Sequence, residues 1–295
     1  MDISDIVDAY GIHIGPLYFR FYGLIIMLGA VLAAFLARRL LIGETRQLPS
    51  GALRKIAPGR KAWLENPDLV WDALLWVLGL GVVGARLYHI FTPSQSLLAV
   101  GIDTSYYLTH PLDILTIWRG GLGMPGAIVG GVLGLYIFAR RNKLSFGFPL
   151  DLATPGVALA QGIGRWGNFI NQELYGPPTD VPWGIFIRLE NRLKGFETYE
   201  RFHPLFLYES VWNLANAGLL LWIWRKYRDR LKEGDLFLVY LVTYPLGRFF
   251  LEFLRIDYVP LAGINLNQGL MALTALASAA FLVIRHRRAP SQAAT

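Results

Sequence analysis

The stretch YGLIIMLGAVLAAFLARRLL, residues 22–41, is an apolar run with a pair of arginines near its end. A helix of about 20 mostly apolar residues is long enough to cross the hydrocarbon core of a bilayer. Further runs of this kind predict helices over residues 69–91, 120–139, 149–170, 206–224, 235–254 and 264–284. The sequence therefore predicts an all-α integral membrane protein with about seven transmembrane helices, built as a single domain over residues 1–295.

The composition agrees with this class. Hydrophobic residues make up 54% of the chain and charged residues 17%, whereas soluble domains carry about 25% charged residues. The mean hydropathy is +0.39. The nine Trp and fourteen Tyr suit the two membrane–water interfaces. Because the chain has no cysteine, a disulfide framework, a cysteine-ligated metal and a cysteine nucleophile are all excluded.

The basic residues predict the orientation of the helices. Four connections and tails hold 18 of the 28 Lys and Arg residues, and they follow the first, third, fifth and seventh runs. Such segments face the cytoplasm, whereas residues 92–113 carry no Lys or Arg and are expected outside. The N-terminus is thus expected outside and the C-terminus in the cytoplasm. The opening MDISDIVDAY has no basic residue, so we expect no cleaved signal peptide.

The net charge of +7 follows from this topology and from attraction to anionic lipid, so we expect no nucleic-acid partner. Two connections between the helices are long. Residues 42–68 contain Pro49, Pro58 and Pro67 and are expected to be irregular, without a chemical role. Residues 172–204 mix turn residues, β-prone runs and charges, which predicts a small extracytoplasmic subdomain. In the third run, GGLGMPGAIVGGVLG has small residues that permit close helix packing.

Several charged residues lie within or at the edge of apolar runs. They are Arg86, Arg165, Glu209, Arg248, Glu252 and Arg255. An arginine at the centre of a bilayer costs roughly 2.5–3.5 kcal/mol, so such residues need a partner, a polar cavity or an interface. On a continuous helix, Arg248, Glu252 and Arg255 share one face and leave positive charge in excess. This pattern favours an anion site, and a guanidinium suits phosphate.

Structural explanations stand beside this one. Arg20, Arg119 and Arg255 lie near the ends of runs, where an arginine can reach the headgroups. Arg86 with an outer acid can form a purely structural pair. The stretch GIGRWGNFINQELYG, residues 162–176, is harder to explain in this way, because a continued helix places Arg165, Asn168 and Asn171 on one side. Its glycines also permit close approach of backbone or ligand, which is typical of a pocket.

These residues carry a resemblance to a known family. GRWGNFINQELYG, residues 164–176, resembles the signature of the bacterial prolipoprotein diacylglyceryl transferases. Further matching motifs follow the family's order, namely RFYGL (20–24), GARL (84–87), WRGGLGMPGA (118–127), HPLFLYE (203–209) and GRFFLEFLR (247–255). The resemblance covers nearly the whole chain.

The resemblance implies an enzyme of the bacterial cytoplasmic (inner) membrane, with its active site toward the outer leaflet. Such an enzyme moves the diacylglyceryl group of phosphatidylglycerol onto the lipobox cysteine of a prolipoprotein, forms a thioether and releases glycerol phosphate. No cofactor is implied, and no His, Asp or Glu cluster has the spacing of metal ligands.

By the same resemblance, the catalytic residues are expected to be Arg165, Arg248, Tyr22 and Glu252. The residues expected to bind phosphatidylglycerol are Arg165, Asn168, Glu173, Gly176, Arg86, Glu209 and Arg255.

The chain departs from the family at Pro125, where many relatives carry a histidine that is a candidate base. His203 and His89 are weaker candidates for that role. The simplest hypothesis uses no histidine: the arginines lower the pKa of the substrate thiol, and a carboxylate or the departing phosphate takes its proton. Two other classes stay open at this point, a noncatalytic phospholipid-binding protein and a secondary transporter, although transporters usually show paired broken helices in two related halves.

Overall fold

The structure is a computed structural model that describes residues 10–14, 17–49, 51–93, 95–117, 120–256 and 265–287. The chain divides into two compact units. The first contains Met1–Ala37 and Leu150–Thr295, and the second contains Arg38–Pro149. Helix α2 (Phe21–Gln47) begins in the first unit and ends in the second.

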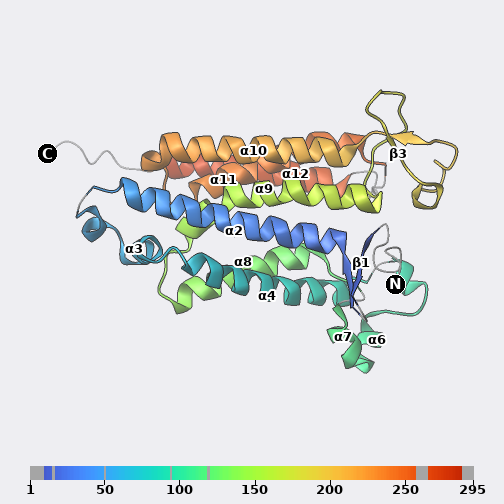
Figure 1. The fold of residues 1–295 in the computed structure, drawn as a ribbon, viewed down its shortest axis with the longest axis horizontal. Helices are drawn as coiled ribbons and strands as arrows, with labels where there is room; N and C mark the ends of the chain where they lie inside the picture. Colours follow the sequence, from blue (N-terminus) through green and yellow to red (C-terminus); the bar gives the residue numbers. More distant parts are fainter. Residues whose placement is uncertain are drawn as a thin grey trace. The chain divides into compact units, whose positions relative to one another are not determined.

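The first unit is a group of long helices with two short antiparallel strand pairs. Its other helices are α9 (Gly147–Asn171), α10 (Leu205–Tyr227), α11 (Asp235–Leu251) and α12 (Leu266–Arg287). Its strands are β1 (Gly11–Ile14), β2 (Leu17–Arg20), β3 (Ile185–Phe186) and β4 (Arg201–Phe202), in which β1 pairs with β2 and β3 with β4. Helix α11 packs against both α10 and α12, and Figure 1 shows these helices running along one another.

The second unit is built on the pair α4 (Leu69–Phe91) and α8 (Met124–Arg141). Its short elements are a 3-10 turn (Ala52–Lys55), α3 (Pro58–Glu65), α5 (Gln95–Leu98), α6 (Thr104–Thr109) and α7 (Pro111–Leu115). Glycines bring α4 and α8 into backbone contact: a Cβ added to Gly84 would lie 2.3 Å from the carbonyl oxygen of Gly126. A Cβ on Gly130 would lie 2.1 Å from the carbonyl oxygen of Leu80. The expected close packing of the glycine-rich run is therefore confirmed.

The chain is mostly helical, as predicted, and it has the character of a membrane protein. Four helices in the described part are long and apolar enough to cross a membrane: Phe21–Gln47, Leu69–Phe91, Asp235–Leu254 and Leu266–Arg287. The last of these turns its leucines outward, with Leu273 66% and Leu276 70% exposed, as expected for a helix that faces lipid. The count of seven crossings and the orientation stay predictions.

The connection over residues 42–68 differs from expectation. It was predicted to be irregular, but α2 extends to Gln47 and α3 begins at Pro58, a residue that suits the first turn of a helix. Buried contacts explain this order. Glu44 forms an ion pair with Arg60, and Trp63, which is 1% exposed, donates its indole N–H to the carbonyl of Ser145 at 3.2 Å.

Residues 172–204 contain the β3–β4 pair and a small apolar cluster. Tyr175, Ile187 and Phe202 are all almost fully buried in it. The Tyr175 hydroxyl donates to the carbonyl of Asn191 at 2.9 Å and accepts the N–H of Leu193 at 2.7 Å. The limits of this segment as a subdomain stay a prediction. The β1–β2 hairpin that precedes α2 was not predicted, because strands of four residues are too short to show a period.

Candidate active site

A buried carboxylate joins two arginines in the first unit. Glu209 lies in the second turn of α10 and is only 3% exposed. Its Oε2 atom lies 2.7 Å from Nη2 of Arg165 on α9, and its Oε1 atom accepts a hydrogen bond from Nη1 of Arg248 on α11. Three helices thus meet at one carboxylate. The two arginines that sequence reasoning placed in the anion site are therefore neighbours in space.

Glu252 completes the ion-pair chain. Its Oε2 atom lies 3.1 Å from Nη2 of Arg248, and its Oε1 atom accepts from the side-chain amide of Asn265 at 3.3 Å. The expectation that Arg248, Glu252 and Arg255 share one helix face is wrong in one respect. Helix α11 ends at Leu251 and a 3-10 turn covers Glu252–Leu254, so Arg255 follows in an extended conformation.

The signature stretch after Arg165 folds back toward this arginine. Asn168 accepts from Nη1 of Arg165 at 3.4 Å and donates to Oε1 of Glu173 at 2.8 Å. The chain reverses directly after α9, and both Gln172 (φ 51°) and Leu174 (φ 54°) adopt positive φ, which is uncommon for residues other than glycine. Local strain of this kind is often found where a side chain must be held at a site. Here the two strained residues flank Glu173, whose carboxylate accepts the hydrogen bond from Asn168.

Two of the signature glycines are required for packing. A Cβ on Gly167 would lie 2.4 Å from the ring of Tyr22, so the glycine allows this tyrosine to lie against α9 two residues beyond Arg165. A Cβ on Gly176 would lie 2.9 Å from that of His203. Gly176 thus contacts protein in this structure, and its expected contact with lipid stays a prediction. The surroundings of Gly164 differ, since nothing lies within 4 Å of its added Cβ.

The charges of the cluster balance more closely than the sequence suggested. Arg165 and Arg248 carry two positive charges, and the two glutamates that they contact carry two negative ones. A guanidinium has five N–H donors, so the carboxylates can orient each arginine without using all of its donors. The Arg165 side chain is 21% exposed and that of Arg248 is 12% exposed. Arg165 is therefore the more accessible arginine for an incoming anion.

Arg86 lies in the second unit, where it binds backbone. Its Nε donates to the carbonyl of Ile114 at 2.9 Å, and its Nη1 donates to those of Gly120 and Gly121 at 3.0 Å. A fourth bond goes to the carbonyl of Asp113. Four carbonyl oxygens thus solvate this buried cation. These contacts support a structural role for Arg86 through backbone carbonyls rather than through the expected acid, and its expected contact with lipid stays a prediction.

The two candidate histidines each contact a tyrosine. Nδ1 of His203 lies 3.0 Å from the hydroxyl of Tyr208, which also accepts the indole N–H of Trp183 at 2.8 Å. Nε2 of His89 lies 3.1 Å from the hydroxyl of Tyr107. Pro125 lies in the first turn of α8, where the ring of a proline is readily accommodated. The position at which many relatives carry a histidine therefore lies at the start of α8.

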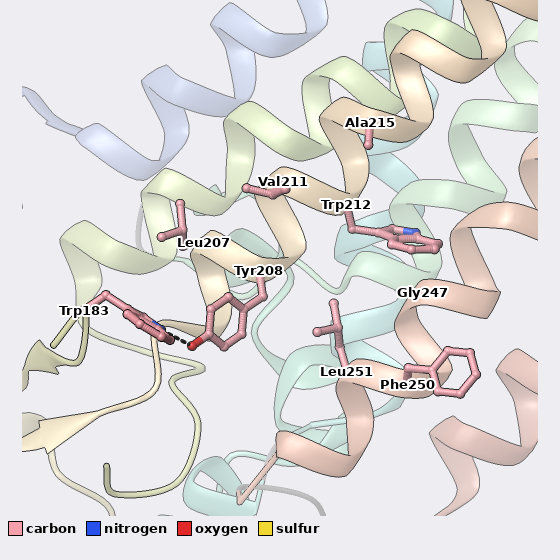
Figure 2. Close-up of a pocket in the computed structure, with 9 residues that line it drawn as sticks. All are labelled: Trp183, Leu207, Tyr208, Val211, Trp212, Ala215, Gly247, Phe250 and Leu251. Carbon is pink, nitrogen blue, oxygen red and sulfur yellow. Dashed lines mark hydrogen bonds between the residues drawn. The ribbon is translucent and has the colours of Figure 1, made fainter. Parts of the chain in front are cut away.

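An apolar groove of about 560 Å³ opens between α10 and α11. Figure 2 shows its lining residues: Trp183, Leu207, Tyr208, Val211, Trp212, Ala215, Gly247, Phe250 and Leu251. Tyr208 and Gly247 directly precede Glu209 and Arg248, so the groove adjoins the ionic cluster along both helices. Gly247 makes room for Trp212, whose indole N–H donates to the carbonyl of Thr243 at 3.2 Å.

Sequence reasoning missed this groove. The residues Tyr208, Val211, Trp212 and Ala215 follow the i, i+3, i+4, i+7 spacing of one helix face. That spacing indicates an apolar face but does not show whether the face is filled or hollow. In the described residues, no group of three or more His, Asp or Glu side chains is arranged to hold a metal ion.

Comparison with known proteins adds a separate observation. A family model described as prolipoprotein diacylglyceryl transferase matches residues 9–284. A Trichormus variabilis protein named phosphatidylglycerol–prolipoprotein diacylglyceryl transferase is 37% identical over 290 residues, covering 95% of this chain and 91% of the relative. A Paenarthrobacter aurescens protein of the same name is 39% identical over 298 residues, covering 96% and 83%. A Streptomyces coelicolor protein, named phosphatidylglycerol–prolipoprotein diacylglyceryl transferase 2, is 37% identical over 280 residues, covering 95% of this chain and 80% of the relative.

Proposed function

Because the chain belongs to the prolipoprotein diacylglyceryl transferase family, we propose that it moves the diacylglyceryl group of phosphatidylglycerol onto a prolipoprotein cysteine. The observation that carries this proposal is the placement of Arg165 and Arg248 on either side of Glu209. Guanidinium groups bind phosphate oxygens in a bidentate manner, and the arrangement presents two of them together. The acceptor supplies the sulfur, since the chain itself has no cysteine.

In the proposed reaction, the sulfur of the lipobox cysteine attacks C3 of the glyceryl group. A carbon–sulfur bond forms, the bond from C3 to the phosphate oxygen breaks, and negative charge grows on the phosphate oxygens. The thiol proton passes to the departing phosphate as this bond breaks, so glycerol phosphate leaves with the charge that the phosphodiester had. Arg165 and Arg248 stabilise the charge that grows on the phosphate oxygens, which is most effective where water is scarce.

Glu209 and Glu252 are positioning residues in this proposal. Each holds a guanidinium in place through an ion pair, so the arginines need little reorganisation when lipid binds. Asn168 and Glu173 support Arg165 from the other side. Tyr22 lies against Gly167 on α9, where its hydroxyl is a candidate to contact substrate.

The departing phosphate is the proposed proton acceptor. A phosphate monoester has a second pKa of about 6, which allows it to carry the proton near neutrality. This choice agrees with Pro125 at the position where many relatives carry a histidine.

The remaining expectations belong to the same proposal. Seven crossings, an outside N-terminus and a location in the bacterial inner membrane are supported by the alternation of Lys and Arg along the sequence. The site then faces the outer leaflet, which holds the donor lipid and receives the exported prolipoprotein. Residues 172–204 follow the signature stretch directly and are the proposed receiver of the lipobox segment.

The test is a purified reaction with phosphatidylglycerol and a lipobox peptide. We expect a heavier, thioether-linked peptide and free glycerol phosphate. A phospholipid-binding protein would bind vesicles without making this product, and a transporter would move solute instead. Failure to form product under conditions where a relative is active would overturn the proposal.

Arg165→Lys tests the role of the more accessible arginine. A lysine is a point charge that cannot reproduce the bidentate contact with phosphate, so we expect turnover to fall by roughly 100-fold or more. Arg225→Lys is a matched control, because Arg225 is exposed near the end of α10 and should tolerate the change. Near-normal turnover of Arg165→Lys would contradict its assigned role.

A further inference from the structure

The connection between α4 and α8 carries three strongly exposed leucines. Residues 95–117, here called the α5–α7 segment, include Leu108, Leu112 and Leu115, which are 68%, 77% and 66% exposed. These values match those of the outward leucines of α12, where Leu273 is 66% and Leu276 is 70% exposed. Such a group of exposed leucines on short helices is unfavourable in water. It therefore needs an apolar or interfacial environment.

Other residues of the segment contact the last turns of α4. The Thr104 hydroxyl donates to the carbonyl of Ile90 at 2.8 Å. Tyr107 is 6% exposed, meets His89, and lies 5.5 Å from the guanidinium of Arg86. Arg86 also donates to the carbonyl of Ile114 at 2.9 Å. These contacts fix the segment to a defined stretch of a helix.

The position of this stretch along α4 agrees with an interfacial depth. The candidate membrane helix ends at Phe91, and Arg86 precedes this end by roughly 7.5 Å, given a rise of about 1.5 Å per residue. Interfacial helices bury their apolar face about 5–10 Å into the boundary between headgroups and acyl chains. Figure 1 shows α6 and α7 at this C-terminal end of α4.

The charges of the segment agree with a lipid environment. Residues 92–117 contain no Lys or Arg, so the face is not built to attract an acidic protein. Asp103 caps α6 by accepting the N–H of Tyr106 at 2.8 Å, and Asp113 accepts from the Tyr106 hydroxyl at 2.8 Å. Both aspartates therefore accept hydrogen bonds from within the segment itself. Tyrosines beside leucines are typical of membrane interfaces.

We propose that the α5–α7 segment is a membrane-surface anchor, in which Leu108, Leu112 and Leu115 insert into the headgroup–acyl boundary of the leaflet where α4 ends. The partner is the lipid surface itself. The anchor holds the end of α4 and the start of the path to α8 at a fixed depth. This inference does not depend on the transferase activity.

The absence of cysteine from the chain makes a direct test possible. Leu108→Cys, Leu112→Cys and Leu115→Cys are made singly, labelled with nitrobenzoxadiazole, and placed in vesicles of phosphatidylcholine and phosphatidylglycerol with or without brominated acyl chains. Leu273→Cys on α12 is the control for lipid contact. Asp229→Cys is the control for water, because the Asp229 side chain is 93% exposed. Quenching by aqueous iodide is measured on the same samples.

We expect brominated lipid to quench the three segment labels at least about half as strongly as the Leu273→Cys label, and iodide to quench them less than about half as strongly as the Asp229→Cys label. Iodide quenching equal to that of Asp229→Cys, without quenching by brominated lipid, would overturn the proposal. Protection from iodide that appears only when a lipobox peptide is added would also overturn it, in favour of a protein-docking face. A transferase assay on the unlabelled protein tests the proposed function separately.

Discussion

The contact between α4 and α8 predicts opposite effects for two glycines on one helix. Gly84 and Gly79 both lie within α4, so an alanine has the same intrinsic helix preference at either position. At Gly84, however, the new Cβ would lie 2.3 Å from the carbonyl oxygen of Gly126 and 3.1 Å from the Cα of Gly130. At Gly79 it would meet nothing within 4 Å.

The distances allow the effect to be estimated. Ordinary contact begins at 3.4 Å, so the Gly84→Ala side chain is too close by about 1.1 Å. The obstructing atoms are backbone and cannot move by changing a rotamer, so the helices must separate. Overpacking of this kind costs about 1–3 kcal/mol. Gly79→Ala should instead stabilise the helix by up to about 1 kcal/mol, which leaves a difference of roughly 1–4 kcal/mol between the variants.

The measurement is the free energy of unfolding in mixed detergent and dodecyl sulfate micelles, followed by circular dichroism. Gly84→Ala should unfold at lower dodecyl sulfate than the parent, and Gly79→Ala at equal or higher dodecyl sulfate. If the two variants unfold together, the backbone contact between α4 and α8 is not present as described and the reasoning fails.

Three further predictions concern the other unit and the proton acceptor. Glu209→Gln removes the charge that Arg165 and Arg248 share, and we expect the same unfolding assay to show a loss of about 3–5 kcal/mol; a loss below about 1 kcal/mol would contradict the shared ion pair. Asp151→Ala removes a carboxylate that accepts the N–H groups of Gly234 and Phe237 at 2.6 and 3.0 Å, near the start of α11. We expect a loss of about 1–3 kcal/mol, whereas Asp229→Ala, at a side chain that is 93% exposed, should have little effect. Replacing His203 and His89 together by Gln should leave appreciable transferase activity, and a loss as large as that of Arg165→Lys would show that a histidine is the base.

The long helices could be predicted because each has a run of apolar residues. The second run was expected over residues 69–91 and forms Leu69–Phe91. The prediction that the third run packs closely through its small residues was also confirmed, since glycines on one side of a helix allow a neighbouring helix to approach its backbone. Local order in residues 42–68 was missed. It depends on contacts such as that of Trp63 with Ser145, which are 82 positions apart in the chain.

The site was predictable in its members but not in its pairing. A charge within an apolar run needs a partner, which identified Arg165, Arg248 and Glu209 as unusual. Which groups pair depends on how α9, α10 and α11 pack, and Glu209 and Arg248 are 39 positions apart. The prediction from helical spacing placed Arg248, Glu252 and Arg255 on one helix face. It was correct for Arg248 and Glu252, which pair at i, i+4, but the helix ends before Arg255.

The pairing explains how an anion site can exist in an apolar protein before its anion arrives. Two guanidinium groups close together without counter-charges would be unstable in a medium of low dielectric constant. Glu209 and Glu252 neutralise them and hold them on three helices. In the proposed reaction the total charge of the reacting groups does not change, because the negative charge that develops on the sulfur passes to the phosphate oxygens as the thiol proton follows. Transfer is therefore favoured by where the arginines are held relative to those oxygens rather than by the net charge of the site. The ion pairs of the two arginines with Glu209 and Glu252 provide that placement.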